Sequence, residues 1–220
     1  MEQDVFVVAI DGPSGSGKST VGRITAERMG FSYLDSGALY RAVALGVLDA
    51  GIDPGDVSAV ARIAVTFNIG VDGDPAGVRL DGREVESLIR SAEVSKAASK
   101  VSAVPEVRAM LTRIQREAAK PPGVVVEGRD IGTVIFPDAG LKIFLNADPT
   151  ERARRRSAEL PGAGAEVQRD MAERDRRDTT RRLAPLETAV DALVVDSTRM
   201  SIEEVVELVV GEVKNRQGTR

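Results

Sequence analysis

Short apolar runs alternate with longer segments of helical periodicity along this chain. The apolar runs lie at residues 5–10, 31–35, 124–126, 141–145 and 192–196. Each run has the length of a buried strand. The predicted helices follow Ser19, cover residues 37–49, 57–66, 84–101 and 105–119, fill the charged stretch before the last strand, and end the chain after Ser201. Strands that alternate with helices favour an α/β fold, so we expect a central sheet of five parallel strands.

Several polar residues and prolines mark the ends of these predicted helices. Ser36 is placed to cap the helix at 37–49, and Pro105 suits the first turn of the helix that follows it. Ser201 precedes Glu203 and Glu204, which is a capping-box arrangement for the last helix. Residues 161–164, Pro-Gly-Ala-Gly, predict a break in the charged helical stretch.

One segment departs from the α/β rhythm. Residues 67–80 alternate apolar and polar side chains around the turn-forming sequence at 72–77, which predicts a hairpin. Asp81-Gly82 is a further turn signal. We interpret this small β segment as an insertion outside the main sheet.

Composition narrows the chemistry that the chain can perform. It has no cysteine and no histidine, which excludes thiolate nucleophiles, cysteine zinc sites and the commonest general base. With 30 basic and 34 acidic residues the net charge is −4, so no global field favours nucleic acid. No apolar run approaches the length of a membrane span, and the acidic N-terminus is unlike a signal peptide. Phosphoryl transfer suits this inventory because it relies on positioning and charge neutralisation. We expect a soluble cytoplasmic protein.

The first predicted strand leads into the sequence Gly12-Pro13-Ser14-Gly15-Ser16-Gly17-Lys18-Ser19, with Thr20 next. It fits the phosphate-binding pattern G-x-x-x-x-G-K-[S/T] at every fixed position, and a strand before it with a helix after it is the required context. Glycines let successive backbone N–H groups point at a phosphate, and the helix N-terminus adds positive potential. Lys18 can reach the β- and γ-phosphates, and the Ser19 hydroxyl can join the coordination of Mg²⁺. The segment therefore predicts an ATP site.

Charged side chains gather where the predicted strands end. Asp11, Asp35, Glu127 and Asp196 fall at the carboxyl ends of strands, where an open parallel sheet collects its functional groups. The segment 169–182 holds six arginines interleaved with acids. A solvated helix with ion pairs between residues four positions apart explains most of these arginines. The functional alternative is a mobile lid whose arginines close over phosphates. Nucleic-acid binding is disfavoured because the acidic residues cancel the basic charge.

Four stretches of the chain resemble the bacterial cytidylate kinases, a branch of the nucleoside monophosphate kinases. They are residues 10–19, residues 34–41 (Leu-Asp-Ser-Gly-Ala-Leu-Tyr-Arg), residues 127–137 (Glu-Gly-Arg-Asp-Ile-Gly-Thr-Val-Ile-Phe-Pro), and Glu173-Arg174-Asp175 through Leu183-Ala184-Pro185-Leu186. Their order and spacing hold from about residue 5 to residue 210. The chain departs from the family pattern at Glu127, where related kinases often have aspartate, and between Arg156 and Arg169, which is short.

The resemblance implies roles for individual residues. Arg41, Arg129 and Arg181, with Ser36, are expected to hold the phosphate of the acceptor. Ser99, Arg108 and Asp130 are expected to recognise cytosine, and Arg174 and Asp178 to contact the sugar. The expected catalytic residues are Lys18, Arg41, Arg129, Asp130 and Arg181, while residues 12–20 bind ATP and Ser19 binds Mg²⁺.

The resemblance also implies an organisation and a reaction. We expect a three-layer P-loop kinase fold with a core at 1–35, 121–147 and 183–220, an arm for the monophosphate at 36–120 that contains the β insertion, and a lid at 148–182. The expected reaction is transfer of the γ-phosphoryl group of ATP to CMP or dCMP by a monomer that binds neither nucleic acid nor membrane. A P-loop kinase for another small acceptor, and a nucleotide switch or nucleic-acid-associated ATPase, are the two alternatives.

Overall fold

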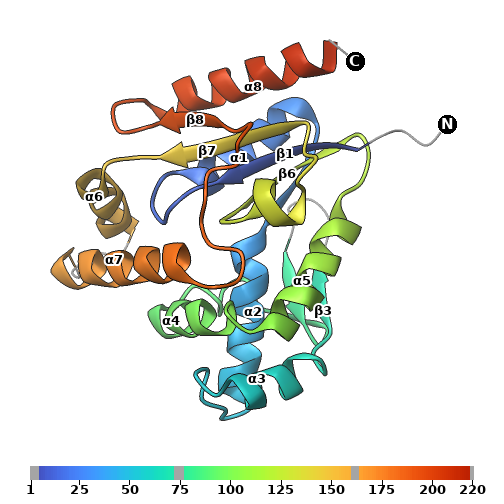
Figure 1. The fold of residues 1–220 in the computed structure, drawn as a ribbon, viewed down its shortest axis with the longest axis vertical. Coiled ribbons are helices and arrows are strands. Elements are labelled where there is room, and N and C mark those ends of the chain that lie inside the picture. The colour runs from blue at the N-terminus through green and yellow to red at the C-terminus, as the bar shows by residue number, and fades with distance from the viewer. Residues whose placement is uncertain (1–4, 72–76, 160–163, 219–220) are drawn as a thin grey trace. The chain divides into compact units, whose positions relative to one another are not determined.

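The computed structural model describes residues 5–71, 77–159 and 164–218. The chain divides into two compact units (Figure 1). The first unit joins residues 1–31 to residues 121–220, and the second is the continuous segment 32–120.

The strands of the first unit are parallel and follow the predicted apolar runs. Their bounds are Phe6–Asp11 for β1, Gly123–Gly128 for β6, Leu141–Asn146 for β7 and Leu193–Asp196 for β8. β1 pairs with β6 on one side and with β7 on the other, and β7 pairs with β8. With β2, Ser32–Asp35, the sheet has the order β2-β6-β1-β7-β8, which confirms the predicted five-stranded central sheet. β6 is buried along its whole length, as expected of a central strand with apolar residues on both faces.

The helices of the first unit follow the strand ends. They are α1, Lys18–Met29; the π-helix η1, Ile131–Ile135; α6, Pro149–Glu159; α7, Gly164–Thr180; and α8, Ile202–Gly218. α1 packs against both β6 and α8. The Arg28 guanidinium reinforces the α1–α8 contact by donating to Glu203 and Glu207 at 2.5 and 2.6 Å. The capping box at Ser201 is confirmed, because its hydroxyl accepts from the Glu204 N–H while Glu204 accepts from the Ser201 N–H.

The second unit is built around α2, Ser36–Asp49, which packs against α3, α4, α5 and β4. The other elements are α3, Val57–Ala64; β3, Ile69–Val71; β4, Val78–Leu80; β5, Arg83–Glu84; α4, Ala92–Val101; and α5, Pro105–Ala118. α2 is almost wholly apolar, so it can contact neighbours on several faces. β3, β4 and β5 form a separate antiparallel sheet, which confirms that the β segment is an insertion.

Two local expectations were wrong and one element was not predicted, each for a physical reason. Asp35, and not Ser36, caps α2, because its carboxylate reaches the Ala38 N–H at 3.0 Å while Ser36 is already helical. The helix expected at 84–101 begins only at Ala92, since Arg83 and Glu84 pair with β4 and Ser91 supplies the cap. The π-helix after Asp130 had no sequence signal, because it depends on a contact from a distant strand.

Two expected turns fall partly outside the described residues. Of the turn expected at 72–77, residues 72–76 lie outside the described residues, and so do residues 161–163 of the break expected at 161–164. Gly164 begins α7.

Candidate active site

The Gly-rich loop leaves β1 through a turn that requires glycine. Gly12 has φ +149°, and a Cβ atom there would lie 2.0 Å from the Leu145 carbonyl oxygen on β7. Gly15 and Gly17 also have positive φ, at 74° and 96°. Such backbone conformations turn N–H groups toward a common concavity, and α1 begins at the next residue. The loop between β1 and α1 therefore has the glycine-dependent backbone that the sequence pattern predicts.

Lys18 lies at the first turn of α1 and is buried. Its ammonium donates to the Pro13 carbonyl at 2.7 Å and to the Ser16 hydroxyl at 3.4 Å. Burial, helped by the nearby Arg129 cation, lowers its pKa to about 7, although the Glu127 carboxylate acts in the opposite direction. The ammonium is thus held beside the loop in a setting where an anionic partner would be strongly favoured.

Two side chains from α6 and α7 hold the middle of the loop. Asp175 accepts from the backbone N–H of Ser14 at 3.3 Å, and its other oxygen accepts from Arg152 at 2.5 Å. Arg152 also donates to the Ser14 carbonyl and to the Ala147 carbonyl. The loop backbone is therefore tied to both helices of the predicted lid.

The arginines of α6 divide into two groups. Arg155 is half-buried and donates to the Ser197 carbonyl at 2.7 Å and to the Ser197 hydroxyl at 3.1 Å. That hydroxyl donates in turn to the Ser16 carbonyl at 3.2 Å, which links α6 to the loop. Arg154 and Arg155 both pair with Glu151 on their own helix, but Arg154 is exposed.

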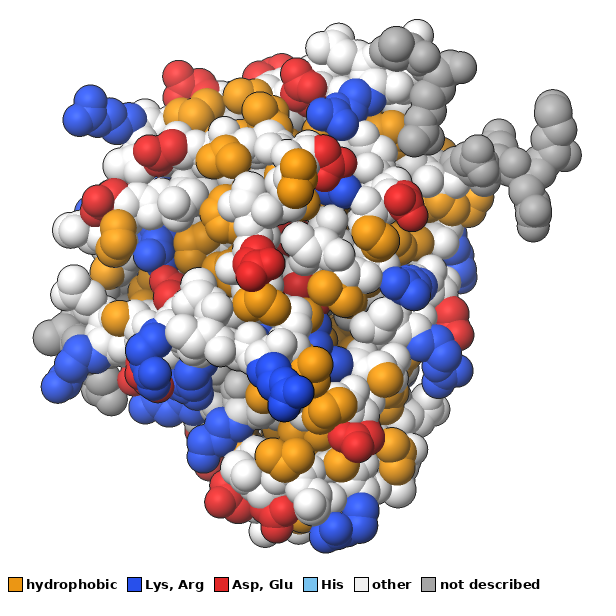
Figure 2. All heavy atoms as spheres, viewed as in Figure 1, with side chains coloured by type: hydrophobic (Ala, Val, Ile, Leu, Met, Phe, Trp, Pro, Cys, Tyr) orange, Lys and Arg blue, Asp and Glu red, His pale blue; other side chains and the backbone are white. Residues whose placement is uncertain are grey.

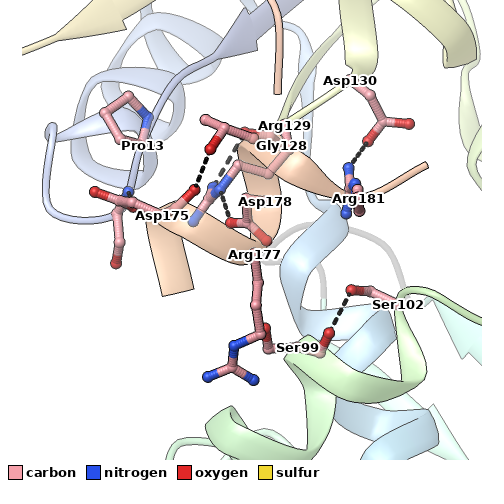
Figure 3. A network of polar contacts seen from close by, with 12 residues as sticks. Pro13, Ser99, Ser102, Gly128, Arg129, Asp130, Asp175, Arg177, Asp178 and Arg181 are labelled. Carbon is pink, nitrogen blue, oxygen red and sulfur yellow. Dashed lines mark hydrogen bonds and ion pairs between the residues drawn. The ribbon is translucent and has the colours of Figure 1, made fainter. Parts of the chain in front are cut away.

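α7 and the residues after it contact the segment that follows β6, as Figure 3 shows. Arg129 donates to the Asp178 carboxylate at 2.8 Å, and both side chains are largely buried. Arg181 donates to Asp130 at 3.3 Å and to the Ala184 carbonyl at 2.6 Å. Burial by itself would raise the pKa of Asp178, but the cations of Arg129, Arg174 and Arg181 outweigh it and hold that pKa below its usual value. Four predicted site residues therefore meet in two ion pairs.

The rest of the arginine-rich helix behaves as a solvated surface. Arg176 and Arg177 pair with Glu173 three and four residues before them, and these side chains are at least one-third exposed. The interpretation of α7 as ion pairs within one helix holds for this face. It does not hold for Asp175 and Asp178, whose partners lie on other elements.

In the second unit, the start of α2 gathers two arginines around one carboxylate. Arg41 donates to Asp35 at 2.7 Å, and Arg90 lies 4.0 Å from the same carboxylate. Burial would raise the pKa of Asp35, but these cations and the Ala38 N–H outweigh it and lower that pKa. Ser36 is buried beside Asp35 in the first turn of α2. The Asp-Ser-Gly-x-x-Tyr-Arg sequence thus brings Ser36 and Arg41 to one helix end.

Two of the three residues predicted to recognise the base, Ser99 and Arg108, lie on α4 and α5. Arg108 is 6% exposed, so it is not an ordinary surface arginine. It lies 5.7 Å from the Tyr40 ring centroid, within cation–π range, and donates to the Ser102 carbonyl at 3.3 Å. The Ser102 hydroxyl donates to the Ser99 carbonyl at 3.1 Å (Figure 3). The Ser99 hydroxyl is buried and has no hydrogen-bond partner among the residues that the structure describes.

The predicted site residues divide between the two units. The first unit holds the loop with Lys18 and Ser19, together with Arg129, Asp130, Arg174, Asp178 and Arg181. The second holds Ser36, Arg41, Ser99 and Arg108.

Sequence reasoning missed residues that act on the site through contacts. Asp175 and Arg152 on the loop, and Ser102 beside Arg108, belong to this group. Asp175 had a sequence signal, since it belongs to the Glu-Arg-Asp stretch that carries the family resemblance. Arg152 had one as well, since it lies in the segment 148–182 expected to form the lid, although its contacts with the loop were not predicted. Ser102 had none, because its contact with Arg108 is through a backbone carbonyl that only the fold brings near.

Three further features of the described residues concern surface charge, metal ligands and membrane-spanning helices. On the face drawn in Figure 2, acidic and basic side chains lie among one another. Within residues 5–71, 77–159 and 164–218 there is no cluster of three or more acidic side chains that could hold a metal ion by itself. No helix in those ranges is long and apolar enough to cross a membrane.

Comparison with known proteins extends beyond the individual motifs. A cytidylate kinase of Pelotomaculum thermopropionicum is 48% identical over 214 residues, which cover 94% of this chain and 95% of that protein. A cytidylate kinase of Mycolicibacterium paratuberculosis is 49% identical over 215 residues and 94% of each chain. Among solved structures, a gluconokinase from Sinorhizobium meliloti covers 97% of this chain and 94% of its own with a TM-score of 0.53 at 15% identity.

The structural likeness to the gluconokinase concerns the fold alone. The sequence comparisons go further, because the family described as cytidylate kinase matches residues 8–215, nearly the whole chain. This span includes the Gly-rich loop, both arginine-bearing motifs and α7. The chain therefore belongs to the cytidylate kinase family.

Proposed function

We propose that this protein transfers the γ-phosphoryl group of ATP to CMP or dCMP, giving ADP and CDP or dCDP. The observation that carries the choice of acceptor is the burial of Arg108 and of the Ser99 hydroxyl. The Arg108 guanidinium is buried near the Tyr40 ring, and the Ser99 hydroxyl is buried with no hydrogen-bond partner among the described residues. An unsatisfied buried hydroxyl is costly to keep in a fold, so it favours a ligand that satisfies it.

The donor side of the reaction is assigned to the Gly-rich loop. Its backbone N–H groups and the N-terminus of α1 suit the phosphates of ATP. The Lys18 ammonium exchanges its contacts with Pro13 and Ser16 for phosphate oxygens, which are stronger acceptors.

The residues present also fit a magnesium ion. Mg²⁺ in kinases binds mainly phosphate oxygens and water, with one or two protein oxygens, so an acidic cluster is not needed. The Ser19 hydroxyl on the first turn of α1 would hold the ion, and the buried Glu127 carboxylate could orient its water shell. The bound ion supplies charge neutralisation for the β- and γ-phosphates.

The acceptor side uses groups whose hydrogen-bonding pattern matches cytosine. The ring offers an amino donor beside the N3 and O2 acceptors. A carboxylate or hydroxyl suits the amine and a guanidinium suits the acceptors, so we assign Asp130, Ser99 and Arg108 to these atoms. Uracil reverses the donor pattern and would leave buried groups mismatched, which is a large penalty.

The phosphate and sugar of the acceptor are assigned to the arginine-rich motifs. Guanidinium groups keep their charge at neutral pH and present paired donors to phosphate oxygens, which suits Arg41, Arg129 and Arg181. Arg174 and Asp178 are assigned to the sugar, and Ser36 assists at the phosphate. The grouping of these residues on one substrate rests on the sequence motifs, and the contacts within each unit support it.

The transfer is direct and in line. The attacking oxygen belongs to an anionic phosphate, so no general base is required and the absence of histidine is no obstacle. Lys18, Arg41, Arg129 and Arg181 stabilise the charge that develops on the transferring group, and Asp130 orients the acceptor.

We assign the core to residues 1–35, 121–147 and 183–220, the monophosphate arm to 36–120 and a lid to 148–182. The compact second unit at 32–120 supports the arm. The ties from Asp175 and Arg152 to the loop support a lid that excludes water from the transfer. A monomeric state, a cytoplasmic location and the lack of nucleic-acid binding stay predictions.

A coupled assay of ADP formation with CMP, dCMP, UMP, AMP, GMP and dTMP tests the proposal. We expect CMP and dCMP to be used at least tenfold more efficiently, in kcat/KM, than every other monophosphate. Preferred use of AMP or dTMP would make this a kinase for another acceptor. ADP release that no monophosphate stimulates would instead indicate a nucleotide switch or ATPase.

A further inference from the structure

Asp11 is a buried carboxylate at the end of β1 that the proposed reaction does not use. It lies immediately before the Gly-rich loop, yet its carboxylate accepts hydrogen bonds from a different segment. One carboxylate oxygen accepts from the Ile131 N–H at 2.8 Å, and the other accepts from the Gly132 N–H at 2.7 Å. These are the first two residues of η1.

The first turn of η1 depends on this contact. The N–H groups at the start of a helix lack partners within the helix, and a side chain of the preceding residue usually satisfies them. Asp130 is the residue before η1, and its side chain makes no such cap. Asp11, on β1, therefore caps η1 in place of Asp130. The Asp130 carboxylate instead accepts a hydrogen bond from Arg181.

Asp11 also fixes the other end of the short segment that joins β6 to η1. Asp11 is the register partner of Gly128, the last residue of β6. Between Gly128 and Ile131 stand only Arg129 and Asp130. The backbone of these two residues is thus held at one end by the strand pairing of Asp11 and at the other by its carboxylate.

We propose that Asp11 is a positioning residue for Arg129 and Asp130, and through them for the acceptor nucleotide. This inference rests on the proposed function, which assigns both residues to CMP. Arg129 meets Asp178 at 2.8 Å and Asp130 meets Arg181 at 3.3 Å, so a shift of their backbone would disturb both ion pairs.

The Asp11 carboxyl group is harder to ionise than an exposed aspartate. Burial raises its pKa to about 6, the two amide hydrogen bonds act against this, Asp130 adds to the rise, and Lys18 opposes it. A raised pKa means that the ionised carboxylate stabilises the fold less than its protonated form does.

Space around the contact is also restricted. A Cβ atom on Gly132 would lie 3.4 Å from the Asp11 carboxylate and 3.2 Å from the side chain of Lys142, whose ammonium is engaged 2.8 Å away by Asp191. Alanine at this position would therefore crowd the Lys142 side chain and reach the limit of ordinary contact with the Asp11 carboxylate, without changing its charge.

Steady-state kinetics of Asp11→Asn and Gly132→Ala test the inference. Asparagine is isosteric with aspartate but sets an NH₂ group against one of the two N–H donors. We expect kcat with CMP to fall between about 10- and 100-fold and the KM for CMP to rise, as for a displaced reacting group. The KM for ATP should stay within about twofold, and circular dichroism should show that the variant is folded at the assay temperature. Gly132→Ala should show the same split to a smaller degree.

Asp196→Asn is the matched control, because Asp196 is also a strand-end carboxylate that accepts from a backbone N–H, that of Thr198. It should keep wild-type kinetics. Wild-type CMP parameters in both test variants, or a KM for ATP that rises in step with that for CMP, would overturn the assignment. If Asp11→Asn does not fold, Gly132→Ala alone decides by the same criteria. Failure of the proposed function itself is distinct, since the wild-type protein would then not phosphorylate CMP.

Discussion

The carboxylate of Asp175, on α7, accepts a hydrogen bond from the Ser14 N–H of the Gly-rich loop, 161 positions earlier in the chain, at 3.3 Å. Backbone N–H groups of such a loop are the donors that suit the phosphates of ATP. A side-chain anion therefore engages one donor that the proposed triphosphate would use, and Arg152 holds that anion in place.

Asp175→Asn should strengthen the binding of ATP. The substitution removes the negative charge that competes for the Ser14 N–H, and a hydrogen bond to a charged group contributes about 1.5–3 kcal/mol. We expect the Kd of a non-hydrolysable ATP analogue with Mg²⁺, measured by calorimetry, to fall roughly threefold to tenfold. Glu173→Gln is the control, because Glu173 pairs only with arginines of its own helix in the contacts described above. Weaker binding in Asp175→Asn would show that Asp175 orders the loop.

Arg181→Ala should lower kcat for CMP by at least about 100-fold and leave the Kd for ATP largely unchanged. The guanidinium is assigned to the charge that develops during transfer, and such groups act on the transition state more than on the bound donor. Stopped-flow or coupled-assay rates at saturating substrates measure the effect. Arg182→Ala, the exposed neighbour, serves as the control. An unchanged kcat would remove Arg181 from the transfer site.

Arg108→Met should impair recognition of the base without affecting the donor. Methionine keeps most of the apolar contact with Tyr40 but loses the hydrogen-bond donors. We expect kcat/KM for CMP to fall about 100-fold, the preference for CMP over UMP to shrink, and the KM for ATP to stay constant. Arg113→Met on the same helix is the control, since Arg113 is exposed and pairs with Glu117. A uniform loss for every monophosphate would indicate a purely structural role for Arg108.

Asp11 should give the protein a distinctive pH dependence of stability. Its pKa rises from 3.8 to about 6 on folding, so the folded state binds more protons than the unfolded state between these values. The free energy of unfolding contributed by this group therefore decreases as the pH rises through that window, by about 3 kcal/mol in all.

Urea unfolding at pH 4, 5, 6 and 7 measures this effect against Asp11→Asn, which cannot titrate. Asp35 and Asp178, whose pKa values are lowered, contribute in the opposite sense, but they are present in both proteins. The stability of the variant relative to wild type should therefore grow with pH. A constant difference from pH 4 to pH 7 would contradict it.

Local patterns in the sequence predicted the framework correctly. The apolar runs predicted the strands β1, β6 and β7 because a short apolar segment favours a strand buried in a sheet. The capping box at Ser201 could be predicted because all of its atoms lie within four consecutive residues.

Errors arose where neighbouring residues compete or where a partner is distant. Asp35 displaced Ser36 as the cap of α2, although both residue types cap helices well. Arg83 and Glu84 joined a strand because β4 offered open hydrogen-bonding groups. Propensity alone does not decide such cases, because the energies that separate the alternatives are supplied by tertiary contacts.

The sequence by itself determined which segments form the strands, the phosphate loop and the motifs that place this chain in its family, because each of these depends on residues close together in the chain. Only the tertiary structure decided which charges are buried and what they contact. Arg108 proved buried against Tyr40, Asp175 proved bound to the loop, and Asp11 proved to cap a helix 120 residues away. Desolvation and hydrogen bonding across such distances exist only once the chain has folded, so no local pattern encodes them.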